Sequence, residues 1–406
     1  MPEFEYQGVD KAGKRVKGRI EAPSEGDVRM TLRGQGIRPQ RITKSGVMNR
    51  DLGNLFSGGG KSVSLETLVS FTRQLQALIS SGIPIVQAME ILSDQTEDKN
   101  FKFTLQSIRE KVSQGSYFWE ALSAYPKTFP KIYIALMRAG EASGAVDQML
   151  KRLSRYLEDA DRLKKTIKSA MMYPAIVITI AVGVIAIMLI FVIPKFEELL
   201  TSSGQELPGP TAFVIWLSHF FVDRIVYIVV GGTIGGYLIL RFAKSPEGRA
   251  FIDRALFKAP LFGNIMKKGG TARFSRSMQT LLSSGVNLMD AIDICQTTIN
   301  NAVLEDAVGK IRVEIESGKT MGSTIGRLNV FPSMAVQMIS VGESTGNLDK
   351  MLEKVADFYE EEVELLVQGL TRLMEPILIV FLGGTVGGLL IAMYLPIFKI
   401  GGAMGG

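Results

Sequence analysis

Two long runs without a charged side chain constrain this chain more than any other feature. Tyr173 to Ile193 is 21 residues long, and Pro376 to Phe398 is 23. At about 1.5 Å rise per residue, helices of this length cross a hydrocarbon layer of about 30 Å. A helix buried in a soluble core seldom stays apolar on every face over this length. We therefore predict two membrane-spanning helices at these positions.

A third apolar stretch is shorter, and we interpret it as a tilted span over 212–243. Its charge-free part, 225–240, follows Asp223 and Arg224, which we expect to lie near one membrane interface. A Pro-Gly-Pro sequence before the stretch ends any earlier helix, and Thr211 is placed to cap a new one.

The distribution of Lys and Arg predicts the orientation of these spans. Segment 151–168 carries seven basic residues and 241–276 carries nine, whereas 195–211 carries one. Basic loops stay in the cytoplasm, so we expect the N-terminus and both basic segments inside and 195–211 outside. One flank departs from this pattern, because 355–375 holds five Glu and one Asp against a single Arg.

Composition excludes several classes of function. The net charge is +6, but its basic excess follows the membrane topology, so no nucleic-acid partner is expected. A single cysteine, Cys295, and a single histidine, His219, exclude an internal disulfide and a zinc site built from Cys and His. His219 lies in an apolar run, which leaves no plausible catalytic pair. We expect no cofactor and no enzymatic activity.

An internal repeat organises most of the chain. Residues 71–90 return as 274–293 with eight identities, at an offset of 203. Further on, Gly-Glu-Ala-Ser-Gly at 140–144 matches Gly-Glu-Ser-Thr-Gly at 342–346, at an offset of 202. The duplicated unit is about 125 residues long and includes a soluble part and the span after it. The unpaired middle span would return the chain, so that both soluble parts face the same compartment.

The spacing of apolar residues in the two soluble parts predicts bundles of short helices. In the first, Leu68, Phe71, Leu75 and Leu78 recur at three- and four-residue spacing, and Gly82 is a natural helix end. Almost nothing there alternates with period two.

The fold class is thus a mainly α polytopic membrane protein with two homologous helical bundles and three spans, preceded by a small α+β module. The predicted division is an N-terminal ββαβ module (1–43), a flexible linker (44–64), a cytoplasmic bundle (65–169), a span (170–194), a periplasmic loop (195–211), a second span (212–243), a second cytoplasmic bundle (244–375), a third span (376–398) and a short tail (399–406).

Two fragments that resemble a phosphate-binding loop do not predict nucleotide binding. Gly-Lys-Ser at 60–62 and Gly-Lys-Thr at 318–320 lack the first glycine of that motif, since Leu55 and Val313 stand there. We interpret them as linker and inter-helix turn.

Glu141 and Glu343, in the repeated Gly-Glu-x-(Ser/Thr)-Gly turns, are the best polar candidates for a site. The favoured interpretation is a helix-joining turn in which the glutamate caps a neighbouring helix. The alternative is a divalent-cation site completed by Asp147 or Asp349. The flanking glycines are assigned a structural or coupling role: Gly140, Gly144, Gly342 and Gly346.

The same duplication pairs the residues that open two of the spans. Tyr173-Pro174 matches Glu375-Pro376. Glu375 is interpreted as an interface marker or salt-bridge partner rather than a proton relay, because the matching residue is Tyr173. In the spans, the spacing of Gly231 with Gly235, and of Gly383 with Gly387, is typical of close helix packing.

Together these features resemble the inner-membrane platform family of type IV pilus and type II secretion machines (PilC/GspF). The resemblance covers nearly the whole chain. It rests on Phe-Thr-Arg-Gln-Leu at 71–75, Ser-Gly-Ile-Pro at 81–84, the doubled Gly-Glu turn, Tyr173-Pro174, and Pro194-Lys195-Phe196 at the end of the first span. A Gly-Gln-Glu-Leu-Pro sequence at 204–208 favours the pilus branch over the secretion branch.

The resemblance implies a bacterial inner-membrane platform without catalysis of its own. Its expected partners are a hexameric assembly or retraction ATPase on the cytoplasmic side, pilins or pseudopilins in the membrane, other inner-membrane components of the machine, and further copies of the chain. A transporter or channel is the competing class, but its spans would carry buried ionisable groups, which the first and third runs lack.

Overall fold

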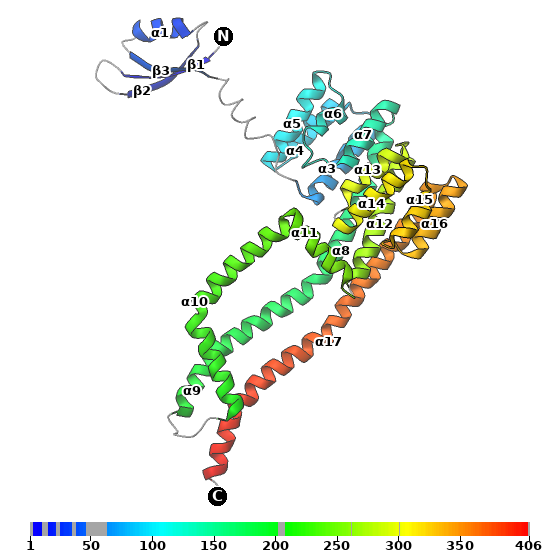
Figure 1. The fold of residues 1–406 in the computed structure, drawn as a ribbon. Coiled ribbons are helices and arrows are strands. Elements are labelled where there is room, and N and C mark those ends of the chain that lie inside the picture. The colour runs from blue at the N-terminus through cyan, green and yellow to red at the C-terminus, as the bar shows by residue number, and fades with distance from the viewer. Residues whose placement is uncertain are drawn as a thin grey trace.

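The structure is a computed structural model that describes residues 3–9, 15–21, 25–34, 38–45, 63–201, 208–260, 262–299 and 301–404 (Figure 1). Most of the predicted linker, and the middle of the predicted loop 195–211, lie outside the described residues.

The N-terminal elements form a three-stranded antiparallel sheet with one helix. The strand order is β2-β1-β3, and the central strand pairs Phe4 with Ile20 and Tyr6 with Gly18. In chain order the elements are β1 (Glu3–Val9), β2 (Arg15–Glu21), α1 (Glu25–Gly34) and β3 (Arg38–Ser45).

The first half of the duplication folds into short helices that follow the predicted pattern. Gly82 and Gly115 adopt φ of +83° and +97° directly after the first and third helices, where an L side chain would be strained. Ser64 and Asp98 cap the starts of those helices with their side-chain oxygens. The helices are α3 (Leu65–Ser80), α4 (Ile85–Gln95), α5 (Lys99–Ser113), α6 (Phe118–Ser123), α7 (Lys131–Ser143) and α8 (Val146–Ile187).

The second half repeats this order after a connecting helix. Gly285 and Gly318 have φ of +79° and +84°, in the places of Gly82 and Gly115. The helices are α11 (Pro246–Lys258), α12 (Phe262–Ser283), α13 (Leu288–Thr298), α14 (Ala302–Glu316), α15 (Met321–Leu328), α16 (Ser333–Thr345) and α17 (Leu348–Met404).

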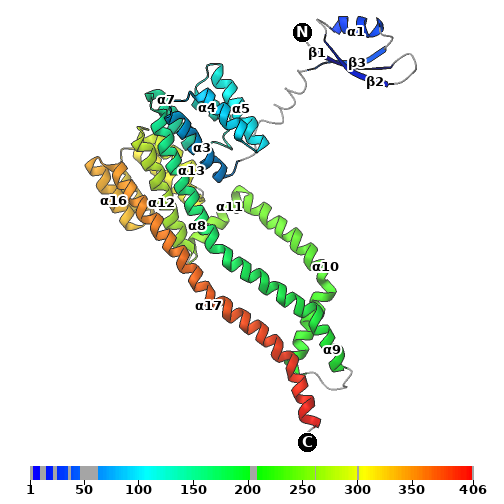
Figure 2. The same ribbon diagram turned by 180° about the vertical axis from the view of Figure 1, so that it is seen from behind.

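The two helical halves share one continuous hydrophobic core. Leu75, Tyr133 and Leu153 from the first half, and Phe274 and Met278 from the second, belong to the same buried cluster. Figure 2 shows α8, α12 and α17 side by side where the halves meet. The mainly helical character predicted from the sequence is confirmed.

Three helices are long and apolar enough to cross a membrane, as predicted: Val146–Glu198, Gly209–Lys244 and Leu348–Pro396. The first of these helices joins the first bundle to the first apolar run without a break, since α8 continues through Pro174. It passes into a π-helix (η1, Met188–Val192) and then α9 (Ile193–Thr201). The helix thus continues past Pro194, the predicted end of the span, because a proline is tolerated in the first turn after the π-helix.

Two further helix ends differ from the prediction. α10 (Gly209–Lys244) begins directly after Pro208, so Thr211 is not its cap. The Thr211 hydroxyl instead donates to the Ala392 carbonyl oxygen at 2.5 Å, joining α10 to α17. α17 continues to Met404, so the predicted tail 399–406 begins as helix.

Candidate coupling site

The Gly-Glu turn of the first half places a carboxylate against the start of a neighbouring short helix. The backbone N–H of Phe118 donates to Glu141 Oε1, and that of Trp119 donates to Oε2, both at 2.8 Å. Tyr117, at the N-cap of α6, makes no side-chain capping bond. Glu141, which lies near the end of α7, therefore caps α6 from outside.

The second half repeats this arrangement. The N–H groups of Met321 and Gly322 donate to the two carboxylate oxygens of Glu343 at 2.7 and 2.9 Å. Thr320, the N-cap residue of α15, again makes no side-chain capping bond. A carboxylate also suits the positive end of the helix dipole. The capping interpretation of both glutamates is thus confirmed.

The same contacts weaken the alternative of a divalent-cation site. Both oxygens of each glutamate already accept a backbone N–H. Asp147 and Asp349, the expected co-ligands, lie in the first turns of α8 and α17. Within the described part of the chain, no group of three or more His, Cys, Asp or Glu side chains could hold a metal ion.

The glycines of the two turns are required by geometry. A Cβ on Gly140 would lie 3.0 Å from Met149 Cγ, and one on Gly342 would lie 2.8 Å from Met351 Cβ. These glycines let α7 and α16 approach the long helices α8 and α17 closely. Gly144 and Gly346 end α7 and α16 in the left-handed region, with φ of 71° and 70°.

The first long helix is tied to the second half by polar contacts. The Arg152 guanidinium donates to Ser283 Oγ at 2.6 Å. The hydroxyls of Tyr156 and Ser277 lie 3.1 Å apart. Both contacts lie on successive turns of α8, the helix that continues into the first span, so the second half is fastened to the membrane-directed helix of the first.

Arg276 of α12 is the centre of an ion cluster at this junction. Its guanidinium binds both carboxylate oxygens of Glu360 at 2.7 and 3.0 Å, and donates to Asp357 at 2.7 Å. Asp159 of α8 lies 4.0 Å from Arg276 Nε. One arginine thus joins α12 to both long helices, α8 and α17.

The ionisation of the cluster follows from its partial burial. Burial lowers the pKa of Arg276, but the hydrogen bonds to Glu360 and Asp357 raise it more, so the guanidinium stays charged. Burial raises the pKa of the Asp159 carboxyl, while Arg276 opposes that rise and Glu360 adds to it.

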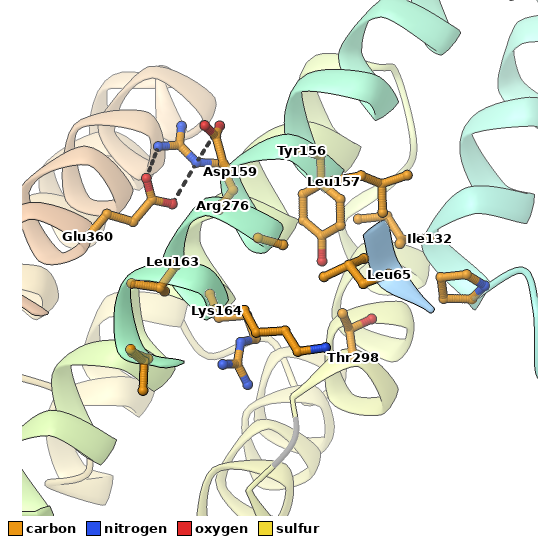
Figure 3. A pocket seen from close by; sticks show the side chains of 14 residues that line it. Leu65, Ile132, Tyr156, Leu157, Asp159, Leu163, Lys164, Arg276, Thr298 and Glu360 are labelled. Atoms are coloured by element: carbon orange, nitrogen blue, oxygen red, sulfur yellow. Dashed lines mark hydrogen bonds and ion pairs between the residues drawn. The ribbon is translucent and has the colours of Figure 1, made fainter. Parts of the chain in front are cut away.

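A cavity of about 510 Å³ lies beside the cluster, between the two halves (Figure 3). Its wall combines apolar side chains with a charged edge. Among the residues labelled in Figure 3, Leu157 and Leu163 of α8 are apolar, whereas Lys164 and Arg276 are charged. We call the set of polar contacts between the two halves the coupling junction. It consists of Arg152, Tyr156, Asp159 and Arg276 with their partners.

The three long apolar helices meet at the end far from the bundles. Leu189, Ile215 and Met393, one from each, belong to a small buried cluster. The Ser218 hydroxyl donates to the Leu189 carbonyl oxygen inside the π-helix. Between this contact and the bundles the helices diverge, as Figures 1 and 2 show from opposite sides.

The span glycines lie on the diverging parts. A Cβ on Gly231, Gly235, Gly383 or Gly387 would meet no atom of the chain within 4 Å. The predicted close packing at these glycines is therefore not made between the spans of one chain. It stays a prediction for contacts with another molecule.

The residues that open the spans lie within continuous helices. Tyr173 is 54% exposed, whereas Pro174 is buried. Glu375 and Pro376 are exposed on α17. The structure records no ion pair for Glu375 with any residue that it describes, so of its two interpretations only that of an interface marker stays a prediction.

Comparison with known proteins identifies the family. The family profile described as "Type II secretion system (T2SS), protein F" matches residues 71–194 and again 274–396. These are the two halves of the duplication. The chain belongs to this family. Its N-terminal domain profile matches residues 1–43 as well. The predicted resemblance to a family of non-enzymatic platform proteins is confirmed.

Pilus proteins are more similar to this chain than secretion proteins are. "Type IV pilus assembly protein PilC" of Myxococcus xanthus is 40% identical over 403 residues, covering 99% of this chain and 96% of its own. The protein of that name from Thermus thermophilus is 38% identical over 408 residues, covering 100% and 99%. "Type II secretion system protein F" of Vibrio cholerae is 29% identical over the full length of both chains. The preference for the pilus branch agrees with this order.

The ion cluster was missed by reasoning from sequence, although two signals point to it. Arginine recurs at the third position of both duplicated segments, as Arg73 and Arg276. The acidic run 355–375 departs from the positive-inside pattern. The structure explains that run, because Glu360 binds Arg276 and Glu362 binds Lys268 at 2.5 Å.

Proposed function

We propose that this protein is a bacterial inner-membrane platform of a type IV pilus machine. In this role it couples a cytoplasmic hexameric ATPase to the insertion or removal of pilin subunits. Membership of the protein F family and the higher identity to pilus assembly proteins support the proposal. A platform of a type II secretion machine is the second candidate, supported by the full-length similarity to protein F of Vibrio cholerae.

One observation carries the coupling function. α8 and α17 each run without a break from the helical bundles into an apolar span. At about 1.5 Å per residue, such a helix is a stiff rod tens of ångströms long. A motor that moves the bundles would therefore move the spans with them. The coupling junction would make α8 and α17 move together.

The proposed topology places both bundles in the cytoplasm. The N-terminal module (1–43), the linker (44–64) and the bundles (65–169 and 244–375) lie inside, and the loop 195–211 lies in the periplasm. The excess of Lys and Arg in the segments 151–168 and 241–276 supports this orientation. Pilins would contact the spans where the glycines of α10 and α17 leave room for a close helix approach.

A proline in the rod tests the coupling function. Lys168→Pro removes one hydrogen bond from α8 and kinks it just before the apolar run, whereas exposed Lys168→Ala leaves the helix intact. In a pilated bacterium that depends on this protein, we expect Lys168→Pro to abolish surface pili while the protein still inserts and co-purifies with the ATPase. Normal piliation by the proline variant, with the alanine variant as control, would contradict coupling through α8.

Thiol labelling tests the topology. In a Cys295→Ala background, a cysteine at Gln205, which lies outside the described residues, should react with an impermeant reagent in whole cells. A cysteine at Lys319, whose side chain is half exposed on the second bundle, should react only after lysis. Labelling of position 319 in whole cells would refute the proposed orientation.

A further inference from the structure

The cavity beside the coupling junction combines an apolar wall with a positively charged edge. Its volume of about 510 Å³ lies within the range of pockets that hold small ligands, about 300 to 1,000 Å³. A wall of this kind favours a ligand with a hydrocarbon part. The apolar side chains come from α8 and from the starts of α3 and α7: Leu65, Ile132, Leu157, Ala160, Leu163 and Ile167.

The positive edge is formed by Lys164 of α8 and Arg273 of α12, which line the same cavity. Both side chains are exposed, and the structure records no ion pair for either with the residues that it describes. Arg276, the third cation of the lining, already binds Glu360. Two positive charges at this edge are therefore available to an anion.

The acidic side chains of the lining lie elsewhere in the cavity. They are Asp159 and Glu360, and both face Arg276 (Figure 3). In the same view the ammonium group of Lys164 extends away from both carboxylates, toward the side of the cavity where Thr298 lies. An anion at Lys164 is therefore not held beside either carboxylate, which would repel it.

The two cations are not part of the duplicated pattern. By the offsets of 203 and 202 residues, Arg273 corresponds to Ser70, and Lys164 corresponds to Leu366. Neither counterpart is charged, so the bundle fold does not itself require a cation at these positions. The cations line one cavity only where α8 of the first half packs against α12 of the second.

The cavity lies close to the membrane-directed part of α8. Ile167 is the lining residue of α8 nearest the first apolar run, and Lys168 after it is the last charged residue of that helix. Lys164 lies one turn earlier, about 6 Å along the helix axis. Lipid headgroups form a layer of about 5 to 7 Å on each side of the hydrocarbon core. Given the membrane placement of the proposed function, the Lys164 side chain can reach this layer.

From these observations we propose that the cavity binds one anionic phospholipid of the cytoplasmic leaflet. Lys164 and Arg273 hold the phosphate, and an acyl chain lies along the apolar wall. A guanidinium donates two parallel hydrogen bonds to a phosphate, and an ammonium adds a compact charge. The lipid contacts α8 and α12 together, so it stabilises the contact between the two halves beside the coupling junction. The proposal rests on the membrane placement given under the proposed function.

Lipid titration tests the site. Full-length protein in detergent micelles is titrated with dioleoyl phosphatidylglycerol, and native mass spectrometry counts the bound lipid. We expect one saturable lipid, bound about tenfold or more tightly than dioleoyl phosphatidylcholine, which has the same chains without a net charge. Equal binding of the two lipids, or no saturable binding, would overturn the proposal.

A headgroup without acyl chains distinguishes a lipid from a free phosphate. Glycerol phosphate and inorganic phosphate carry the anion but cannot use the apolar wall. Neither should displace phosphatidylglycerol at equal concentration. Displacement by either one would show that the site binds a soluble phosphate, which would overturn the assignment of a lipid.

Charge reversal separates the cavity from a general attraction to the basic surface. K164E and R273E should each weaken phosphatidylglycerol binding by about tenfold or more, with Tm unchanged because both side chains are exposed. K168E is the matched control, since Lys168 is exposed on the same helix, nearer the apolar run, and does not line the cavity. It should leave binding nearly unchanged.

An equal loss of binding in K168E, or unchanged binding in K164E and R273E, would overturn the proposal. Lipid binding is measured without pili, so its failure leaves the platform function standing. Failure of the membrane placement itself is detected separately, by thiol labelling at position 319.

Discussion

At the scale of the residue, Glu141 and Glu343 supply caps that their target helices lack. Each carboxylate meets two N–H groups at the start of a short helix that has no side-chain cap of its own. Short helices gain little stability from their own hydrogen bonds, so their position depends on such outside contacts. The glutamates therefore fix α6 and α15 to α7 and α16.

We predict that Glu343→Ala destabilises the second bundle by about 2 kcal/mol, since two part-buried N–H groups lose their acceptor. Thermal unfolding of the purified protein should show a lower Tm, with a smaller decrease for Glu343→Gln, which keeps one acceptor. Glu110→Ala, an exposed change on α5, is the control. An unchanged Tm in the alanine variant would mean that the cap contributes nothing.

Cys295 gives a second prediction, because its thiol is fully buried in the shared core. Burial raises the pKa of this thiol, so it stays protonated and unreactive in the folded protein. Maleimide at pH 8 should modify it only when denaturant unfolds the second bundle. Rapid modification of the native protein would contradict this burial.

The same pKa shift gives a pH dependence of known sign. The unfolded thiol ionises near pH 8.5, whereas the folded thiol does not, so raising the pH from 7 to 10 favours unfolding. The stability of the native protein should therefore fall relative to Cys295→Ala over that range. A constant difference between the two would show that Cys295 titrates alike in both states.

At the scale of the element, Arg276 decides how α12, α8 and α17 fit together. Replacing it leaves Glu360, which is 14% exposed, and Asp159, which is 21% exposed, without their counter-charge. We expect Arg276→Ala to cost about 2 to 3 kcal/mol in thermal unfolding. Arg254→Ala removes an exposed arginine with no recorded partner in the described chain, and it should change Tm little. Equal effects of both substitutions would remove the special role of Arg276.

Most helix ends could be predicted because they depend on local backbone chemistry. Gly82, Gly115 and Gly144 each stand where the chain takes a positive φ, and proline precedes α4 and α7. These preferences belong to the residues themselves and are visible without any tertiary information.

The features that were missed depend on partners distant in sequence. Thr211 looks like a helix cap, but its hydroxyl binds a carbonyl 181 residues away. The π-helix before Pro194 leaves a carbonyl that Ser218 of another span satisfies. Arg276 is visible as a repeated arginine, but its acidic partners follow only from the packing of α12 against α17 and α8.

At the scale of the whole molecule, the span glycines give a prediction that separates stability from assembly. Because no atom of the chain lies near a Cβ on Gly384, Gly384→Leu should leave Tm unchanged. It should reduce piliation if pilins pack on this face of α17. Gly342→Leu is the contrasting variant and should unfold the second bundle, since its Cβ would clash with Met351. Full piliation by Gly384→Leu would exclude a packing role for that face.

The divergence of the three long helices between the bundles and their far contact has a mechanical consequence. From Val367, a buried residue of α17, to Ala392 near the far contact is 25 residues, or about 38 Å at about 1.5 Å per residue. If the far contact acts as a pivot, a swing of only about 5° displaces the bundle end by roughly 3 Å. A small rotation of the bundles would then change how far apart the long helices stand where they diverge.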